Sequence, residues 1–221
     1  MMEQSQINQN PTEKKRWKIL GVEFVYLWFF GIGVAFLGWF VENLARALGS
    51  PATWDCRFHL LPFISPYGLL PLAFHVALGD PDDLVIFGKR LFREKTRKSV
   101  ICSNVIAFVF MCLGVFLGEL AVGNLWDALF GVKLWDYTGY PLTLTQYTSI
   151  VTTLGLGAGA YLLFRFVYKP LLHLIRARVS FKVAKWVSCT LGVAIVLDTV
   201  VMIVFLAVFK EAPMYWSISF R

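Results

Sequence analysis

Three acidic residues and one arginine are the candidates for a binding or catalytic site in this sequence. Glu42, Glu119 and Asp136 stand in or beside long apolar segments, where an ionised carboxylate is costly unless another group pairs with it. Arg57 lies between the first two apolar segments, and the planar fork of a guanidinium can bind two carboxylates at once. These residues could form a clamp between two loops, a binding site, or a pair of catalytic acids.

A catalytic role lacks the neighbouring groups that it would need. Chemistry at paired acids usually requires a nucleophile or a metal ion beside them. His59, His75 and His173 are scattered without the spacing of metal ligands, and the sequence has no CxxC and no GxxxxGK[ST] motif. We therefore predict no catalytic residue, no metal and no cofactor. A clamp is favoured over a substrate or lipid-headgroup site, and both are favoured over catalysis.

Aromatic residues frame the last of these acids, in the stretch GVKLWDYTGYPLTL at residues 131–144. Trp and Tyr favour the membrane–water interface, so Trp135 and Tyr137 indicate that Asp136 lies near a membrane surface. Arg57 is expected near the same surface, where it could tie this stretch to its own loop. We therefore predict one outward-facing polar cluster that contains Glu42, Arg57, Glu119, Trp135, Asp136 and Tyr137.

The composition indicates that these residues are carried by a membrane protein. Of 221 residues, 57% are hydrophobic and 16% are charged, and the mean hydropathy is +0.63. A soluble domain is about 45–50% apolar and about 25% charged. Crossing a hydrocarbon core of about 30 Å takes roughly 20 apolar residues in a helix, and about five segments approach that length. They lie near residues 19–41, 62–79, 100–123, 148–168 and 188–209.

These segments predict an all-α integral membrane protein with a single transmembrane domain over residues 19–209. Residues 1–18 are predicted to be a disordered basic tail on the cytoplasmic side, without a removed signal peptide. Residues 210–221 are predicted to be a short C-terminal tail.

The second segment is interrupted by residues that break a helix. Pro62, Pro66, Gly68 and Pro71 fall within LPFISPYGLLPL, together with Tyr67. Proline removes a helical hydrogen bond, and non-helical backbone at membrane depth must be satisfied by protein or water. This segment is therefore predicted either to re-enter the membrane or to pack inside the bundle.

Two further acids lie within apolar segments and have no assigned role. Glu23 stands near the start of the first segment, where a shift of one turn would place it at the interface. Asp198 stands midway along the fifth segment and is the most isolated acid of the sequence.

The positive charge follows the pattern expected of membrane topology. The net charge is +7, and 16 of the 21 Lys and Arg residues lie at the N-terminus or in the loops after the second and fourth segments. Because Lys and Arg mark cytoplasmic loops, we predict a cytoplasmic N-terminus and an outside C-terminus, and no role in nucleic-acid binding. Residues 84–98 and 170–186 are predicted to form cationic helices on the cytoplasmic membrane surface.

Five short motifs follow one another along the chain: FLGWFVE at 36–42, CRFHLLPFISPYG at 56–68, GEL at 118–120, LFGVKLWDYTGYPLTL at 129–144 and YKPL at 168–171. This ordered set resembles the bacterial CmpB-like permeases, the ABC-transporter type IV family. The resemblance covers roughly residues 31–175 and leaves the fifth segment outside. The family tends to show Asn-Leu-x-Gly-Arg after Trp-Asp-Tyr, whereas this chain has TLTQY at 143–147, and Phe58 replaces the usual Gly after the arginine. The matching residues are Gly38, Trp39 and Glu42, then Arg57, Pro62, Tyr67 and Gly68, then Glu119, and finally Phe130, Gly131, Trp135, Asp136 and Tyr137.

This resemblance implies a transporter permease or accessory subunit in the bacterial cell membrane. Its implied partners are the lipid bilayer, a separate ATPase subunit, and a lipid or small-molecule substrate. Two alternatives stay open. One is a cell-envelope or lipid-handling factor, with or without enzymatic activity, and the other is a non-catalytic membrane scaffold.

Overall fold

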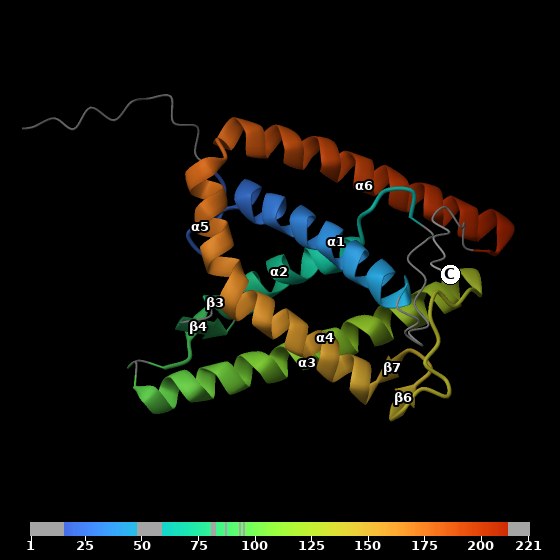
Figure 1. Ribbon diagram of the computed structural model, residues 1–221, viewed down its shortest axis with the longest axis horizontal. Coiled ribbons are helices and arrows are strands. Elements are labelled where there is room, and N and C mark those ends of the chain that lie inside the picture. Colours follow the sequence, from blue (N-terminus) through green and yellow to red (C-terminus); the bar gives the residue numbers. More distant parts are fainter. Residues whose placement is uncertain are drawn as a thin grey trace, which may run out of the picture.

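Long apolar helices form most of the molecule in this computed structural model, which describes residues 16–47, 59–80, 83–86, 88–92, 94 and 96–211 (Figure 1). Four helical stretches in this part of the chain are long and apolar enough to cross a membrane. They are α1 (Phe24–Ala47), α3 (Arg97–Phe130), the continuous run of α4 (Ile150–Leu162), η2 (Leu163–Tyr168) and α5 (Lys169–Arg178), and α6 (Phe181–Phe209). The predicted fold class, an all-α membrane protein, is confirmed.

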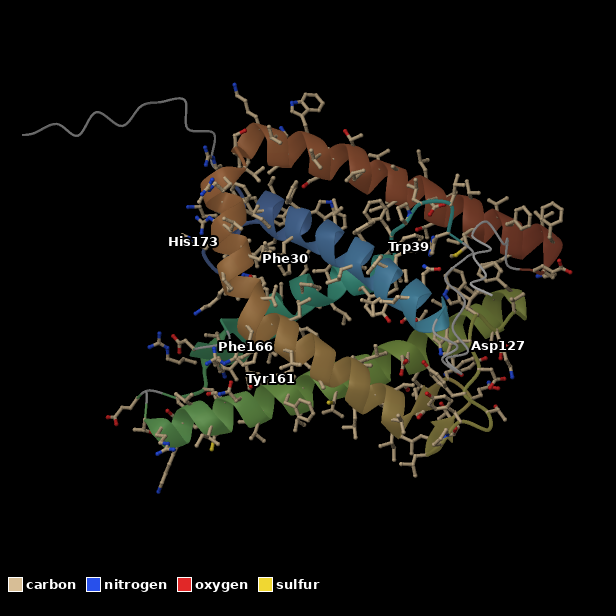
Figure 2. The ribbon with its side chains drawn as sticks, viewed as in Figure 1. Phe30, Trp39, Asp127, Tyr161, Phe166 and His173 are labelled. Carbon is tan, nitrogen blue, oxygen red and sulfur yellow. The ribbon has the colours of Figure 1, made fainter. Side chains whose placement is uncertain are left out.

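The long helices run between two chemically different ends of the bundle. The starts of α1, α3 and α6 and the end of α5 lie on the left in Figure 1, and the opposite helix ends lie on the right. Figure 2 places His173 of α5 at the first end and Asp127 of α3 at the second. We call them the basic end, after Arg97, Lys98, Arg176, Arg178, Lys182 and Lys185, and the aromatic end, after Trp126, Trp135, Tyr137, Tyr140 and Tyr147.

Helix α2 (Ser65–Leu78) has 14 residues and spans only part of the bundle. It starts beside the middle of α1, where the backbone N–H of Ile64 donates to the carbonyl of Ala35 over 3.1 Å. It ends at the basic end, where Nε2 of His75 donates to the carbonyl of Ile19 over 3.0 Å. At 1.5 Å per residue, α2 covers about 21 Å of a core of about 30 Å.

Most of the residues predicted to break this segment lie before α2 or in its first turn, whereas Pro71 lies inside the helix without ending it. Pro62 precedes the helix, and Pro66 occupies its first turn, where a proline costs no helical hydrogen bond. Gly68 lies against Gly31 of α1, and a Cβ atom on Gly68 would lie 2.8 Å from the carbonyl oxygen of Gly31. The two backbones therefore touch directly, which allows a short helix to stay buried beside a long one.

The loop after α2 differs from its prediction. Residues 84–98 were expected to form a cationic helix, but β3 (Gly79–Asp80), β4 (Asp83–Ile86) and β5 (Lys89–Arg90) form a small antiparallel sheet there. Gly88 has a φ of 83°, which turns the chain between β4 and β5, and Val85 and Ile86 favour strands. Nη2 of Arg90 also lies 2.7 Å from Oδ2 of Asp83. This helix prediction was wrong.

The second predicted cationic helix, 170–186, is divided between two elements. Helix α5 ends at Arg178, because Val179 is extended, and Ser180 caps the next helix by accepting from the N–H of Val183. Lys182 and Lys185 therefore belong to the first turns of α6. Two further strand pairs are β1 (Lys18–Ile19) with β2 (Val22–Glu23), and β6 (Thr143–Thr145) with β7 (Thr148–Ser149).

Candidate functional site

A cavity of about 530 Å³ lies between α1, α2, α3 and α4. Cavities of about 300–1,000 Å³ are typical of small-molecule sites. The walls are almost entirely apolar, and some of the lining residues, including Leu37, Leu69 and Gly159, are exposed. The cavity is therefore open to the surface of the molecule.

Glycines form much of the wall on the α3 and α4 side. Gly118, Gly155 and Gly159 line the cavity, and a Cβ atom on any of them would meet no atom within 4 Å. Gly114 differs, because a Cβ atom there would lie 3.2 Å from Phe74. The missing side chains leave space for a ligand between the helices.

Two acids, Glu42 of α1 and Glu119 of α3, line the same cavity. The Glu42 carboxylate accepts a hydrogen bond from the hydroxyl of Tyr67, which also lines the cavity. The Glu119 side chain is 7% exposed, and its Oε1 accepts from the hydroxyl of Tyr137 over 3.0 Å. Its Oε2 is buried and has no hydrogen-bond partner among the described residues.

The neighbouring loop supplies the partner of Glu119. Tyr137 is buried, and its pKa is raised by that burial, by the charge of Glu119 and by the charge of Glu42. The Tyr137 hydroxyl therefore stays protonated at neutral pH and donates its hydrogen to Glu119. The influence of both carboxylates on one hydroxyl is consistent with Glu42 and Glu119 lying at the same end of the cavity.

Trp135 joins this loop to the cavity and to the rest of the aromatic end. Its side chain is 3% exposed and lines the cavity, and its Nε1 donates to the carbonyl of Tyr147 over 3.1 Å. The ring of Tyr147 lies so close to Gly123 that a Cβ atom there would be 2.4 Å away. The Tyr147 hydroxyl donates to Oδ2 of Asp127 over 2.7 Å. The loop is thereby held against α3.

Asp136 lies apart from the other two predicted acids. Its Oδ1 accepts from the backbone N–H of Thr138 over 2.8 Å, and its Oδ2 lies 3.1 Å from Nζ of Lys133. Hydrogen bonds from Thr138 and then from Lys133 lower the pKa of Asp136 to about 2. Asp136 is half-exposed and stabilises a local turn, while Trp135 and Tyr137, its sequence neighbours, face the interior.

The structure thus brings Glu42, Glu119, Trp135 and Tyr137 together and adds Tyr67 to them. Arg57 lies outside the described residues, so the predicted arginine clamp stays a prediction. Pro66 and Gly68 contribute through the placement of α2, and Pro66 also lines the cavity.

Asp198 has a structural environment that sequence reasoning missed. It is buried in α6, and its Oδ1 accepts from the N–H of Leu60 over 2.9 Å. Its Oδ2 accepts from the N–H of Leu61 over 3.3 Å and lies 3.1 Å from Nδ1 of His59. This acid therefore satisfies the non-helical backbone ahead of α2. The available signals were an acid in the middle of an apolar segment and a broken segment elsewhere.

A second set of polar contacts joins helices at the basic end. The hydroxyl of Tyr168, in the π-helical turn η2, lies 2.7 Å from Nδ1 of His75 in α2. Nη2 of Arg176 lies 3.1 Å from Oε2 of Glu23, which is ion-pair distance without hydrogen-bond alignment. Glu23 therefore has a cation beside it, which offsets the cost of a buried carboxylate near the start of an apolar segment.

Comparison with known protein families matches residues 27–203 to the family described as Putative ABC-transporter type IV. This chain belongs to that family. Comparisons with curated proteins and with solved structures gave no match. Membership and the four long apolar helices identify a multi-pass membrane protein related to transporters.

The family match corrects the extent of the resemblance seen in the sequence. The fifth apolar segment was expected to lie outside the family region, which was placed at 31–175, but the match continues through most of α6 and includes Asp198. The residues that line the cavity of this ABC-transporter type IV protein also lie within the matched range.

Proposed function

We propose that this protein is a permease-type or accessory subunit that holds a transported molecule in the cavity between α1 and α4. The observation that carries this proposal is a largely apolar cavity that two acids, Glu42 of α1 and Glu119 of α3, line. Carboxylates are expensive in an apolar region, and a bound ligand could supply a further polar partner for them. Family membership supports a role in transport.

A separate ATPase subunit would supply the energy. The sequence contains no GxxxxGK[ST] motif, so the phosphate-binding loop of such a system would have to come from another chain. The basic end is the proposed docking surface, because α5 and the start of α6 present Arg178, Lys182 and Lys185 there, all exposed. Under the positive-inside rule this end faces the cytoplasm of a bacterial cell.

The continuous run of α4, η2 and α5 offers a physical link between the ATPase and the cavity. Gly155, Gly159 and Phe164 line the cavity from this run, and Arg178 ends it at the basic end. Its π-helical turn, η2, begins at the cavity wall with Leu163 and Phe164 and leads into α5, and such turns often mark functional positions in helices. A displacement of α5 would therefore be transmitted to the cavity wall.

Purification of the tagged full-length protein from its native membrane, after mild crosslinking, tests this proposal. We expect an ATP-binding subunit among the crosslinked proteins. Replacing Lys182 and Lys185 by Glu should reduce its recovery severalfold without loss of folding, because acids are favourable in the first turns of a helix. Lys210→Glu, at the other end of α6, is the control and should not change recovery. Absence of any ATP-binding subunit, or equal loss with the control, would overturn the proposal.

The second candidate is a lipid-handling factor, which the outward opening and apolar walls of the cavity favour. It would use the same cavity without an ATPase. Recovery of lipid- or wall-synthesis enzymes instead of an ATP-binding subunit would support it.

A further inference from the structure

We infer that the cavity binds an acyl chain of a phospholipid from the surrounding bilayer, with the tip of the chain at Phe74 and its head toward the aromatic end. The chain, rather than the head group, carries the binding. This lipid would be the transported molecule, so its assignment rests on the proposed role of the cavity as a substrate site. Three features of the described residues support it: the chemistry of the wall, the depth of the cavity and its closed inner end.

Polar side chains line the cavity only toward the aromatic end. Among the described lining residues, Glu42, Tyr67, Glu119 and Trp135 carry polar side-chain atoms. Tyr67 donates to Glu42, and Glu119 accepts from Tyr137 of the loop that also carries Trp135. The other lining residues are Gly, Ala, Pro, Val, Leu and Phe. The backbone groups of a helix bond within it, and a buried water needs about 2–4 polar partners, so the apolar part of the cavity suits hydrocarbon better than water.

The cavity has about the depth of one leaflet of a bilayer. Its lining runs from Gly114 to Val122 on α3, and from Gly155 to Phe164 on the run of α4 and η2, which returns toward the basic end. Gly114 and Phe164 each lie at the middle of their membrane-spanning stretch. At about 1.5 Å per residue, the lining on α3 covers about 12 Å, and half of a hydrocarbon core is about 15 Å thick. The cavity therefore extends from the middle of the bundle toward the aromatic end, as an acyl chain of that leaflet would.

Two aromatic rings close the inner end of the cavity. A Cβ atom on Gly114 would lie 3.2 Å from the ring of Phe74, so this ring lies against the middle of α3. Phe164 lines the cavity from η2, and both rings belong to the buried core of the bundle. A chain that extends inward from the aromatic end would therefore stop at these rings.

The middle of the cavity has free space beside its glycines. Gly118, Gly155 and Gly159 are exposed, and a Cβ atom on any of them would meet no atom within 4 Å. An empty apolar cavity deprives its wall of van der Waals contacts. With α3 centred in the bilayer, the cavity lies at the depth of the acyl chains, and the exposed lining residues Leu37 and Leu69 show that it is open there. A chain of a neighbouring phospholipid could therefore enter from the side and fill it.

Competition binding to the purified full-length protein tests the inference. The probe is radiolabelled palmitoyl lysophosphatidylcholine, and the detergent has a rigid steroid as its apolar part, so that it supplies no competing chain. We expect saturable binding when concentrations are expressed as mole fractions in the micelle. Monopalmitoylglycerol, which has the same chain and a neutral head, should compete within about tenfold of the unlabelled probe, whereas glycerophosphocholine, the head without a chain, should not compete. Competition by glycerophosphocholine but not by monopalmitoylglycerol, or binding that does not saturate, would overturn the inference.

The length of the chain gives a second readout. An extended chain advances roughly 1.2 Å per bond, so roughly ten carbons fill a depth of about 12 Å. Lysophosphatidylcholines with short chains should therefore compete more strongly as the chain grows, by about tenfold or more in total, and this gain should level off at about ten carbons. A steady gain up to the palmitoyl chain would contradict a closed inner end at Phe74.

Two pairs of variants locate the chain. Gly159→Leu should fill the cavity and weaken binding about tenfold or more. Its control, Gly33→Leu, changes an exposed helical glycine outside the lining that also has no atom within 4 Å of a Cβ, and it should bind as before. Phe74→Ala should open the inner end and shift the levelling-off to longer chains, whereas Phe166→Ala, at an exposed ring of η2 outside the lining, should not. If Phe74→Ala does not fold, the glycine pair decides: equal affinities of its two members would contradict the assignment.

This test is separate from the test of the ATPase partnership. Saturable chain binding without any ATP-binding partner would leave the ligand assignment standing and remove the proposed transport role. Recovery of an ATPase partner without saturable binding of the lysophosphatidylcholine probe would do the reverse.

Discussion

At the scale of single residues, two buried acids differ in how completely their carboxylate oxygens are hydrogen-bonded. Asp198 accepts from the N–H groups of Leu60 and Leu61 and lies against His59, so both of its oxygens have partners. Glu119 has one donor, Tyr137, on Oε1 and none for Oε2 among the described residues. Complete pairing suits a structural acid, and incomplete pairing beside a cavity suits one that meets a ligand.

Asp198→Asn should therefore destabilise the fold without changing the chemistry of the cavity. The amide loses the negative charge and turns an NH₂ group toward donors, which leaves at least one backbone N–H unsatisfied. A hydrogen bond to a charged group contributes about 1.5–3 kcal/mol, so we expect a loss of about 2 kcal/mol in the free energy of unfolding. Thermal unfolding in detergent would measure it.

The matched control for this variant is Thr199→Val, the next residue along α6. The Thr199 hydroxyl donates within its own helix, to the carbonyl of Ile195 over 2.9 Å, so its removal should cost little. If the two variants unfold at the same temperature, Asp198 does not hold the segment ahead of α2.

At the scale of secondary structure elements, α2 stays buried because its backbone can approach that of α1. A Cβ atom on Gly31 would lie 2.6 Å from the carbonyl oxygen of Gly68. The contact leaves no room for a methyl group on either side, and so the pairing of the two helices depends on both glycines.

Gly31→Ala should separate α1 from α2 and destabilise the protein. Overpacking of this kind costs about 1–3 kcal/mol. Gly33→Ala, two residues along the same helix, meets no atom within 4 Å and should be neutral or slightly stabilising, because alanine favours helices. Unfolding of both variants in detergent, followed by circular dichroism, measures the difference. Equal stabilities would show that the close approach is not important for the fold.

The elements also show which parts of the fold could be predicted from the sequence. Hydropathy alone was sufficient for the long helices, because a run of apolar residues has few alternatives in a membrane protein. It was not sufficient for residues 83–90, where Gly88 and the Arg90–Asp83 pair favour a hairpin over a cationic helix. A hairpin and a surface helix can carry the same basic residues, so the charge pattern could not distinguish between them.

The grouping of the candidate site residues could also be predicted in part. Glu42, Glu119, Trp135 and Tyr137 were grouped through the topology and a family resemblance, and the structure places them around one cavity and its adjoining loop. Asp136 was grouped with them as a sequence neighbour, but residues 135, 136 and 137 need not face the same side of an irregular loop. Tyr67 was predicted only as part of the backbone break, since its hydroxyl partner comes from another helix.

At the scale of the whole molecule, the chain returns to the basic end between α1 and α3 through the short helix α2, although the described residues contain four long apolar helices. The described segment 59–64 begins beside the middle of α6, and α2 then continues to the basic end beside Ile19. Residues 59–64 are not helical, and Asp198 binds their first backbone N–H groups, so α2 can start partway through the bundle. If the bundle spans a bilayer, its N-terminus and C-terminus should lie on opposite sides.

This topology predicts different labelling of two loops by a membrane-impermeant maleimide in intact cells. In a variant without native cysteines, Gly139→Cys in the loop between α3 and α4 should be labelled, because this exposed position lies at the aromatic end. Ser180→Cys, exposed between α5 and α6 at the basic end, should be labelled only after the cells are opened. A reporter fused after Arg221 should also read as outside.

Labelling of Ser180→Cys, but not of Gly139→Cys, in intact cells would invert the proposed orientation and place the ATPase surface on the wrong side. Labelling of both loops in intact cells would mean that α4, η2 and α5 do not cross, and the cavity that they line would then need a different membrane setting.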